Sequence, residues 1–200
     1  MSAISAKEVK ALRDRTGAGM LACRDALNES SGDIEKAVEI LRAKGEAKAA
    51  KRAGTEASEG VVQSYIHAGS KLGVLVEVNC ETDFVARNEK FVEFARDVAL
   101  HIAASPTILA VTEDGVPEDV RASEERIATE QASDKPENVR ERIVKGKLDK
   151  WLDEVVLLRQ THVNPDKHDG KTIDELRAAL AAEMGENVVV RRYARFAVGD

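Results

Sequence analysis

Residues 72–78 read Leu-Gly-Val-Leu-Val-Glu-Val, and the first, third, fifth and seventh positions all carry large apolar side chains. A repeat of two is typical of a β-strand that buries one face. Residues 61–66 give a second strand candidate, and the intervening residues 67–70 are typical of a hairpin loop. A third candidate covers residues 188–198. Because helical patterns separate these strands, the sequence predicts an α+β fold with a small antiparallel three-stranded sheet.

The N-terminal part of the chain has helical periodicity instead. Ser5 and Glu8 form a capping box, so a first helix is expected from there to the stop signal at Thr16 and Gly17. A third helix is expected to start after Asp33 and to end at Lys44-Gly45. Between them, a second helix is predicted by apolar residues spaced three and four apart: Met20, Cys23 and Leu27.

Residues 46–59 are rich in alanine, lysine and glutamate, which favours an exposed linker. The expected domains are therefore a three-helix module of residues 1–45, this linker, and an α+β core of residues 60–200. The core is expected to begin with a helix that has Phe91 on its apolar stripe, followed by a surface helix in the acidic residues 117–131. A helix around Trp151 is expected next, and then a polar loop at residues 164–170. The last helix is expected between the capping box Thr172/Glu175 and a stop at Gly185.

Charge and cysteine content restrict the kind of protein. The chain has 30 lysines and arginines against 36 acids, a net charge of −6, whereas proteins that bind duplex nucleic acid usually carry a basic surplus. Cys23 and Cys80 form no CxxC pattern, so neither a disulfide framework nor a zinc site is expected. Without a signal peptide or a long apolar run, the chain is expected to be cytoplasmic and free of contact with a membrane.

Basic residues nevertheless gather in two places. Either group is explained by a solvated face, and either would also suit an acidic protein partner. Few aromatic residues accompany them for stacking on bases. The two groups are Arg42, Lys44, Lys48, Lys51 and Arg52 before the first strand, and Arg191, Arg192 and Arg195 in the last strand.

No pattern predicts an active site. Gly17-Ala18-Gly19 begins a match to the dinucleotide fingerprint, but the helix expected before it replaces the strand which that site requires. The chain contains neither a GxSxG elbow nor a Walker sequence. We therefore expect no catalytic residue, no cofactor and no metal, and predict that the protein is not an enzyme. No ligand spacing is found among the four histidines, His67, His101, His162 and His168.

Residues 77–87 combine the end of a strand with the start of a helix. Thr82 or Asp83 is placed to cap that helix, so a carboxylate and the ring of Phe84 are expected together at its N-terminus. Counting back seven residues from Phe91 also reaches Phe84, so helical periodicity alone favours a buried ring. The pattern leaves both a buried and an exposed Phe84 open.

Leu21 favours the exposed alternative. At about 100° per residue it falls roughly 130° from the centre of the apolar stripe of its helix, so it is expected to be exposed beside Met20. One exposed leucine means little alone. Together with an exposed Phe84, however, it indicates a protein-binding surface.

Three stretches resemble the bacterial elongation factor Ts family. Residues 12–20, Leu-Arg-Asp-Arg-Thr-Gly-Ala-Gly-Met, resemble its first signature, and residues 77–87, centred on Thr-Asp-Phe-Val, resemble its second. Residues 185–192, Gly-Glu-Asn-Val-Val-Val-Arg-Arg, are similar to the end of that family's sequences. The likeness runs from end to end with mild departures, among them Leu21 where methionine is common and residues 160–163, Gln-Thr-His-Val, where Gln-Pro-Phe-Val is common.

The resemblance implies a guanine-nucleotide exchange factor for the translational GTPase elongation factor Tu. It implies that the module is a ubiquitin-associated-like domain that docks on the GTPase through Arg13, Met20 and Leu21. It also implies a homodimer, since short members of the family pair two chains. A second contact with the GTPase, which disturbs the magnesium and phosphate contacts that hold GDP, is implied for Thr82, Asp83, Phe84 and Val85.

Two other functions remain open at this point. A ubiquitin-associated-like adaptor would bind a partner without remodelling it, which explains the module but leaves residues 82–85 without a role. An RNA-binding translation accessory would show a steep salt dependence of its RNA affinity. Release of GDP from elongation factor Tu separates exchange from both alternatives.

Overall fold

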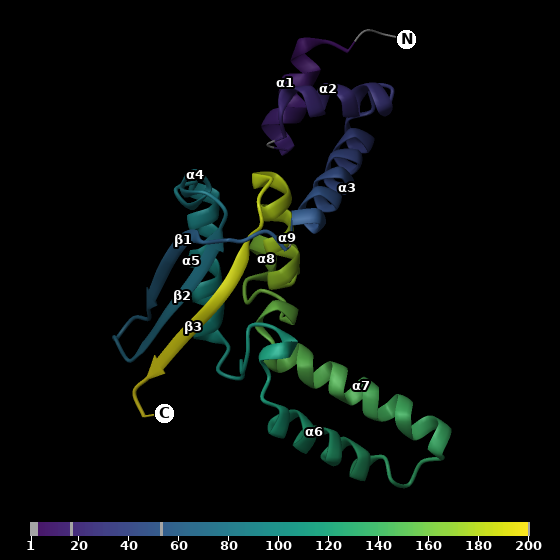
Figure 1. Ribbon diagram of the computed structural model, residues 1–200, viewed down its shortest axis with the longest axis vertical. Helices are drawn as coiled ribbons and strands as arrows, with labels where there is room; N and C mark the ends of the chain where they lie inside the picture. The colour runs from purple at the N-terminus through teal and green to yellow at the C-terminus, as the bar shows by residue number, and fades with distance from the viewer. Residues whose placement is uncertain (1–3, 17, 53, 200) are drawn as a thin grey trace. The chain divides into compact units, whose positions relative to one another are not determined.

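A computed structural model describes residues 4–16, 18–52 and 54–199 of the chain (Figure 1). The chain divides into two compact units, each assembled from segments that are distant in the sequence. The first unit comprises residues 1–60, 79–92 and 177–189, and the second comprises residues 61–78, 93–176 and 190–200.

The first unit contains the predicted three-helix module. The capping box is present, because the backbone N–H of Ser5 donates to the Glu8 carboxylate at 2.7 Å and the N–H of Glu8 donates to Ser5 Oγ at 3.2 Å. Asp33 Oδ1 accepts the N–H of Lys36 at 3.1 Å and so opens the third helix. Gly17, half of the predicted stop signal, lies outside the described residues. The helices are α1 (Ala6–Thr16), α2 (Met20–Glu29) and α3 (Ile34–Arg52), around a core of Val9, Leu12, Cys23, Ala26, Leu27 and Ala37.

The predicted end of the third helix at Gly45 is wrong, because α3 continues to Arg52. A glycine ends a helix when it adopts a positive φ, and Gly45 does not. Residues 46–52 are mainly alanine, lysine and arginine, which favour the helix strongly enough to outweigh one glycine. The first part of the predicted linker is therefore a continuous helical extension of the module.

The sheet has the predicted composition and order. Its strands are β1 (Glu59–Ile66), β2 (Leu72–Cys80) and β3 (Val189–Ala197), antiparallel and in the order β1-β2-β3. The hairpin at residues 67–70 is closed by a hydrogen bond from the N–H of His67 to the carbonyl of Leu72 at 2.9 Å. One face of β2 buries Val74, Val76 and Val78, and the helix α5 (Glu89–Ala104) covers that face (Figure 1).

The remaining long helices follow the predicted order, with short additional helices between them. The second capping box is present, since the N–H of Thr172 donates to the Glu175 carboxylate at 2.8 Å. Gly185 ends its helix with a φ of +72°. A one-turn helix, α8, forms inside the predicted polar loop, because Asn164 Oδ1 caps it by accepting the N–H of Lys167. The elements are α4 (Asp83–Ala86), η1 (Glu113–Gly115), α6 (Glu118–Gln131), α7 (Glu137–Val155), η2 (Leu157–Arg159), α8 (Pro165–His168) and α9 (Ile173–Met184).

The α+β fold class is thus confirmed, as is the exposed position of the acidic helix α6, in which only Ala128 is buried. Among the described residues, no helix combines the length and the apolar character needed to cross a bilayer.

Two helical glycines, one in α7 and one in α3, give a matched test of how closely α3 approaches α9. A methyl group added to Gly146 in α7 meets no atom within 4 Å, so Gly146→Ala is expected to raise the free energy of unfolding by about 0.5–1 kcal/mol. A methyl group on Gly45 would lie 3.1 Å from Cβ of Ala182 in α9. Gly45→Ala should therefore raise the free energy of unfolding by less than Gly146→Ala does, or lower it. Urea denaturation measures both, and an equal gain at the two positions would contradict the close approach of α3 to α9.

Candidate functional site

The turn between β2 and α4 carries the motif singled out in the sequence. Thr82 is extended, with φ −128° and ψ 153°, and its side-chain oxygen accepts the N–H of Val85, so Thr82 rather than Asp83 is the N-cap. The Asp83 carboxylate instead accepts a hydrogen bond from the Arg87 guanidinium at 2.7 Å. Residues 82–85, hereafter the tip, therefore present a carboxylate that pairs with the C-cap residue of the same short helix.

Phe84 projects from the tip with 82% of its surface exposed. The ring does not continue the buried stripe, because α4 ends at Ala86 and α5 begins only at Glu89. Counting back from Phe91 assumed one uninterrupted helix, and the break changes the direction of every earlier side chain. Ala86 is turned inward and buried in its place. Of the two alternatives for Phe84, the exposed one is confirmed.

The second set of predicted residues lies on the module. Leu21 is 62% exposed, as predicted, and Arg13 in the last turn of α1 is also exposed. Met20 was expected on the buried stripe of the second helix, but it is 45% exposed. The buried side of α2 is formed by Ala26 together with Cys23 and Leu27. Met20 and Leu21 are thus two adjacent exposed apolar residues at the start of α2.

Two acidic residues that sequence reasoning did not single out hold the base of the tip. The Glu186 carboxylate accepts the N–H groups of Glu81 and Thr82 at 3.0 Å each and the Thr82 hydroxyl at 2.6 Å. Glu81 accepts the N–H of Asn187 at 2.6 Å and the Nε–H of Arg52 at 2.9 Å. Arg52 and Asn187 together lower the pKa of Glu81 to about 2. Both glutamates lie in the family-like stretches, but no local signal links residues about 105 positions apart.

The buried thiol of Cys80 adds a further contact to this base. Its Sγ donates to the carbonyl of Thr82 at 3.2 Å. Burial, with the Glu186 charge as the next cause, raises the pKa of the thiol to about 11, so it stays protonated and remains a donor at neutral pH. Cys23 is likewise a buried free cysteine.

Sequence spacing did not predict that three histidines come together, namely His101, His162 and His168. The ring centroids of His101 and His162 are 5.4 Å apart, and those of His162 and His168 are 4.1 Å apart. Nδ1 of His101 accepts the N–H of Val163, and Nδ1 of His162 accepts that of Asn164, both at 3.0 Å. Burial lowers the pKa of His101 and, with His162 as the next cause, that of His168. The three rings pack against one another in the second unit. Within the described residues, no group of three or more ligating side chains is placed to hold a metal ion.

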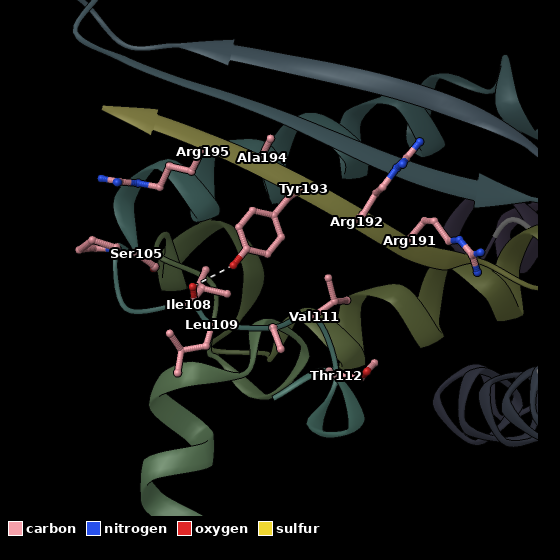
Figure 2. Close-up of a pocket in the computed structure, with 13 residues that line it drawn as sticks. Ser105, Ile108, Leu109, Val111, Thr112, Arg191, Arg192, Tyr193, Ala194 and Arg195 are labelled. Atoms are coloured by element: carbon pink, nitrogen blue, oxygen red, sulfur yellow. Dashed lines mark hydrogen bonds between the residues drawn. The ribbon is translucent and has the colours of Figure 1, made fainter. Parts of the chain in front are cut away.

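Figure 2 shows a hollow of the second unit, about 570 Å³, between β3 and residues 105–115. Tyr193 crosses it and donates from its hydroxyl to the carbonyl of Ile108 at 2.8 Å. Arg191 and Arg195 flank the tyrosine, and Leu109 lines the opposite wall. The residues that line it include neither a histidine nor a carboxylate.

The sequence of this chain matches those of a known protein family. The family model described as Elongation factor TS matches residues 6–169. Elongation factor Ts of Desulfotalea psychrophila is 52% identical over 200 residues, which cover 98% of this chain and 99% of the relative. The same-named protein of Acaryochloris marina is 50% identical over 202 residues, with 100% and 83% covered, and that of Trichodesmium erythraeum is 50% identical, with 100% and 91% covered. The protein is a translation elongation factor. The chain belongs to the elongation factor Ts family.

Exposure of the tip gives a direct stability prediction. Because Phe84 is 82% exposed, Phe84→Ala should change the free energy of unfolding by no more than about 1 kcal/mol. The matched control is Phe91→Ala, which removes a fully buried ring and should cost about 3–5 kcal/mol. Thermal or urea denaturation compares the two variants, and a similar large loss for both would place Phe84 in the core.

Proposed function

We propose that the protein is a guanine-nucleotide exchange factor that binds elongation factor Tu with GDP and promotes release of the nucleotide. The observation that carries this proposal is the exposed ring of Phe84 beside the partly exposed carboxylate of Asp83, in a chain of the elongation factor Ts family. Exposed aromatic residues are typical anchors of protein interfaces. The protein performs no covalent chemistry in this role, and it acts in the cytoplasm, where translation takes place.

The two sets of exposed residues have different tasks in this proposal. Arg13, Met20 and Leu21 on the helical module of residues 1–45 dock on the GTPase and supply affinity. The tip, including Thr82 and Val85, enters between two helices of the GTPase and displaces the magnesium and phosphate contacts of GDP. Because binding favours a state that holds nucleotide weakly, the exchange factor and the nucleotide reduce each other's affinity by the same factor.

The tip favours this function over the two alternatives. An adaptor that only binds needs the module, and it gives no role to an aromatic residue held out on a separate short helix. An RNA-binding accessory needs free cations, whereas several basic residues are paired with acids: Lys44 with Glu29, Arg52 with Glu81, and Arg192 with Glu77. We propose that the protein makes no direct contact with nucleic acid, so its RNA binding near physiological salt should be weak.

Removal of the ring should separate docking from release. Phe84→Ala is expected to bind elongation factor Tu through the module and to release GDP at least about tenfold more slowly, because a loss of about 1.4 kcal/mol of transition-state stabilisation corresponds to that factor. Asp83→Asn should lose less, since the ring still enters the GTPase. Stopped-flow release of fluorescent GDP measures both rates. Full activity of Phe84→Ala would contradict the proposal, and binding without any acceleration by the wild-type protein would support the adaptor.

We also propose that a second copy of the chain covers the open face of the sheet. Arg192 bonds with Glu77 at 2.7 Å on the face opposite the buried valines of β2. Large exposed apolar side chains share that face, and contiguous patches of this kind are uncommon on monomers. A twofold axis between two chains would bring this apolar patch of one chain against the same patch of the other. Its members are Val62, Ile66, Leu75, Phe196 and Val198, of which Ile66, Leu75, Phe196 and Val198 line one shallow groove.

Light scattering at micromolar concentration tests this pairing. The wild-type protein should have a mass of about twice 21.7 kDa, and Phe196→Asp should give a mass near one chain because it places a charge in the apolar contact. Leu109→Asp is the matched control, since Leu109 is equally apolar, half exposed and outside the patch. A single-chain mass for the wild-type protein would contradict the homodimer.

A further inference from the structure

The tip has few restraints of its own. Its helix α4 is only four residues long, and a single helical turn is unfavourable alone because it fixes several dihedral angles for one hydrogen bond. The side-chain cap from Thr82 Oγ1 to the N–H of Val85 spans 3.5 Å, the long end of the hydrogen-bond range. Because the ring of Phe84 is exposed, its burial does not help to hold the tip in place. The direction of the tip must therefore be fixed by groups outside α4.

Glu186, between α9 and β3, supplies that restraint. Its Oε2 accepts two consecutive backbone N–H groups, those of Glu81 and Thr82, and its Oε1 accepts the Thr82 hydroxyl. Hydrogen bonds to a carboxylate are roughly twice as strong as neutral ones. Because the hydroxyl proton of Thr82 is donated to Glu186, a lone pair of the same oxygen is left for the N–H of Val85. Glu186 thus orients the cap as well as the backbone before the tip.

The contact is reciprocal, which makes it more than a local loop interaction. Glu81 accepts the N–H of Asn187 while Glu186 accepts the N–H of Glu81, so each segment binds the backbone of the other. The side-chain amide of Asn187 also donates to the carbonyl of Thr55 at 2.8 Å. We call this pair of segments, residues 81–82 and 186–187, the clamp. It joins three parts of the first unit at the base of the tip.

We propose that Glu186 is a positioning residue for nucleotide release, which holds the tip in the direction that Asp83 and Phe84 need to enter the GTPase. This inference rests on the proposed function of the tip. Glu186 acts through Thr82, since its carboxylate is occupied by backbone and hydroxyl donors. The docking residues on the module are untouched by its removal. Loss of Glu186 should therefore lower the maximal rate of GDP release and leave the half-saturating concentration nearly unchanged.

The experiment compares Glu186→Ala and Glu186→Gln with wild type in stopped-flow release of fluorescent GDP from elongation factor Tu, over a range of exchange-factor concentrations. We expect Glu186→Ala to lower the maximal rate about tenfold and to shift half-saturation by less than about threefold. Glu186→Gln keeps a carbonyl oxygen for the two N–H groups, so it should recover part of the rate. The matched control is Glu183→Gln, which removes a carboxylate of α9 that pairs with exposed Lys90 and should leave the rate unchanged.

A double-mutant cycle shows whether Glu186 acts through the ring. Adding Glu186→Ala to Phe84→Ala should cause a much smaller further loss of rate than Glu186→Ala causes alone, because only Asp83 remains of the two groups that Glu186 positions. A merely structural role would instead give additive losses of the release rate, and Glu186→Ala would melt at a lower temperature and bind elongation factor Tu proportionately more weakly. Additive losses of rate would overturn the proposal, and so would a proportionate loss of binding. A maximal rate for Glu186→Ala equal to that of wild type would also overturn it.

The outcomes separate this inference from the proposed function. A slow Phe84→Ala with a fast Glu186→Ala rejects the positioning role alone and leaves the exchange function in place. A fast Phe84→Ala rejects the function of the tip and the positioning role with it. Should Glu186→Ala fail to fold, Glu186→Gln carries the same comparison, and a wild-type rate for that folded variant counts against the proposal.

Discussion

An aromatic ring displayed in solvent on one turn of helix depends on hydrogen bonds made elsewhere. The clamp supplies them by pairing carboxylates with backbone N–H groups, which would otherwise be left without partners at the end of β2 and the start of β3. Since Arg52 and Asn187 lower the pKa of Glu81 to about 2, this carboxylate is charged across the physiological range. Its contribution to stability is complete above the unfolded pKa of about 4.3 and is lost as the pH falls toward about 2.

The same residues connect the tip to the module. Arg52 is the last residue of α3 and bonds with Glu81 directly before Thr82. With 19 residues at 1.5 Å each, α3 is about 28 Å long and continuous. The first half of the segment expected to be an exposed linker is thus helical.

Local signals in the sequence were sufficient for most of the fold. Both capping boxes, at Ser5 and Thr172, are reproduced, because reciprocal side-chain and backbone bonds three residues apart need no tertiary partner. The end of α3 was mispredicted at Gly45, since helix propensity in the following residues and packing on Ala182 outweigh one glycine.

The candidate site was predicted less evenly. Exposure of Leu21 follows from helical angle alone, whereas Phe84 was ambiguous until the break between α4 and α5 was known. The clamp could not be foreseen, because its partners are about 105 residues apart and ordinary in composition. The gathering of His101, His162 and His168 is of the same kind, produced by tertiary packing rather than spacing.

The sequence separation across the clamp also orders the events of folding. The module α1–α3 is built from contacts among about 50 consecutive residues, and loops of that size close at lower entropic cost than a loop of about 105 residues. Contacts between distant segments form late on average. A newly made chain is therefore expected to form the three-helix module before Glu186 reaches Thr82.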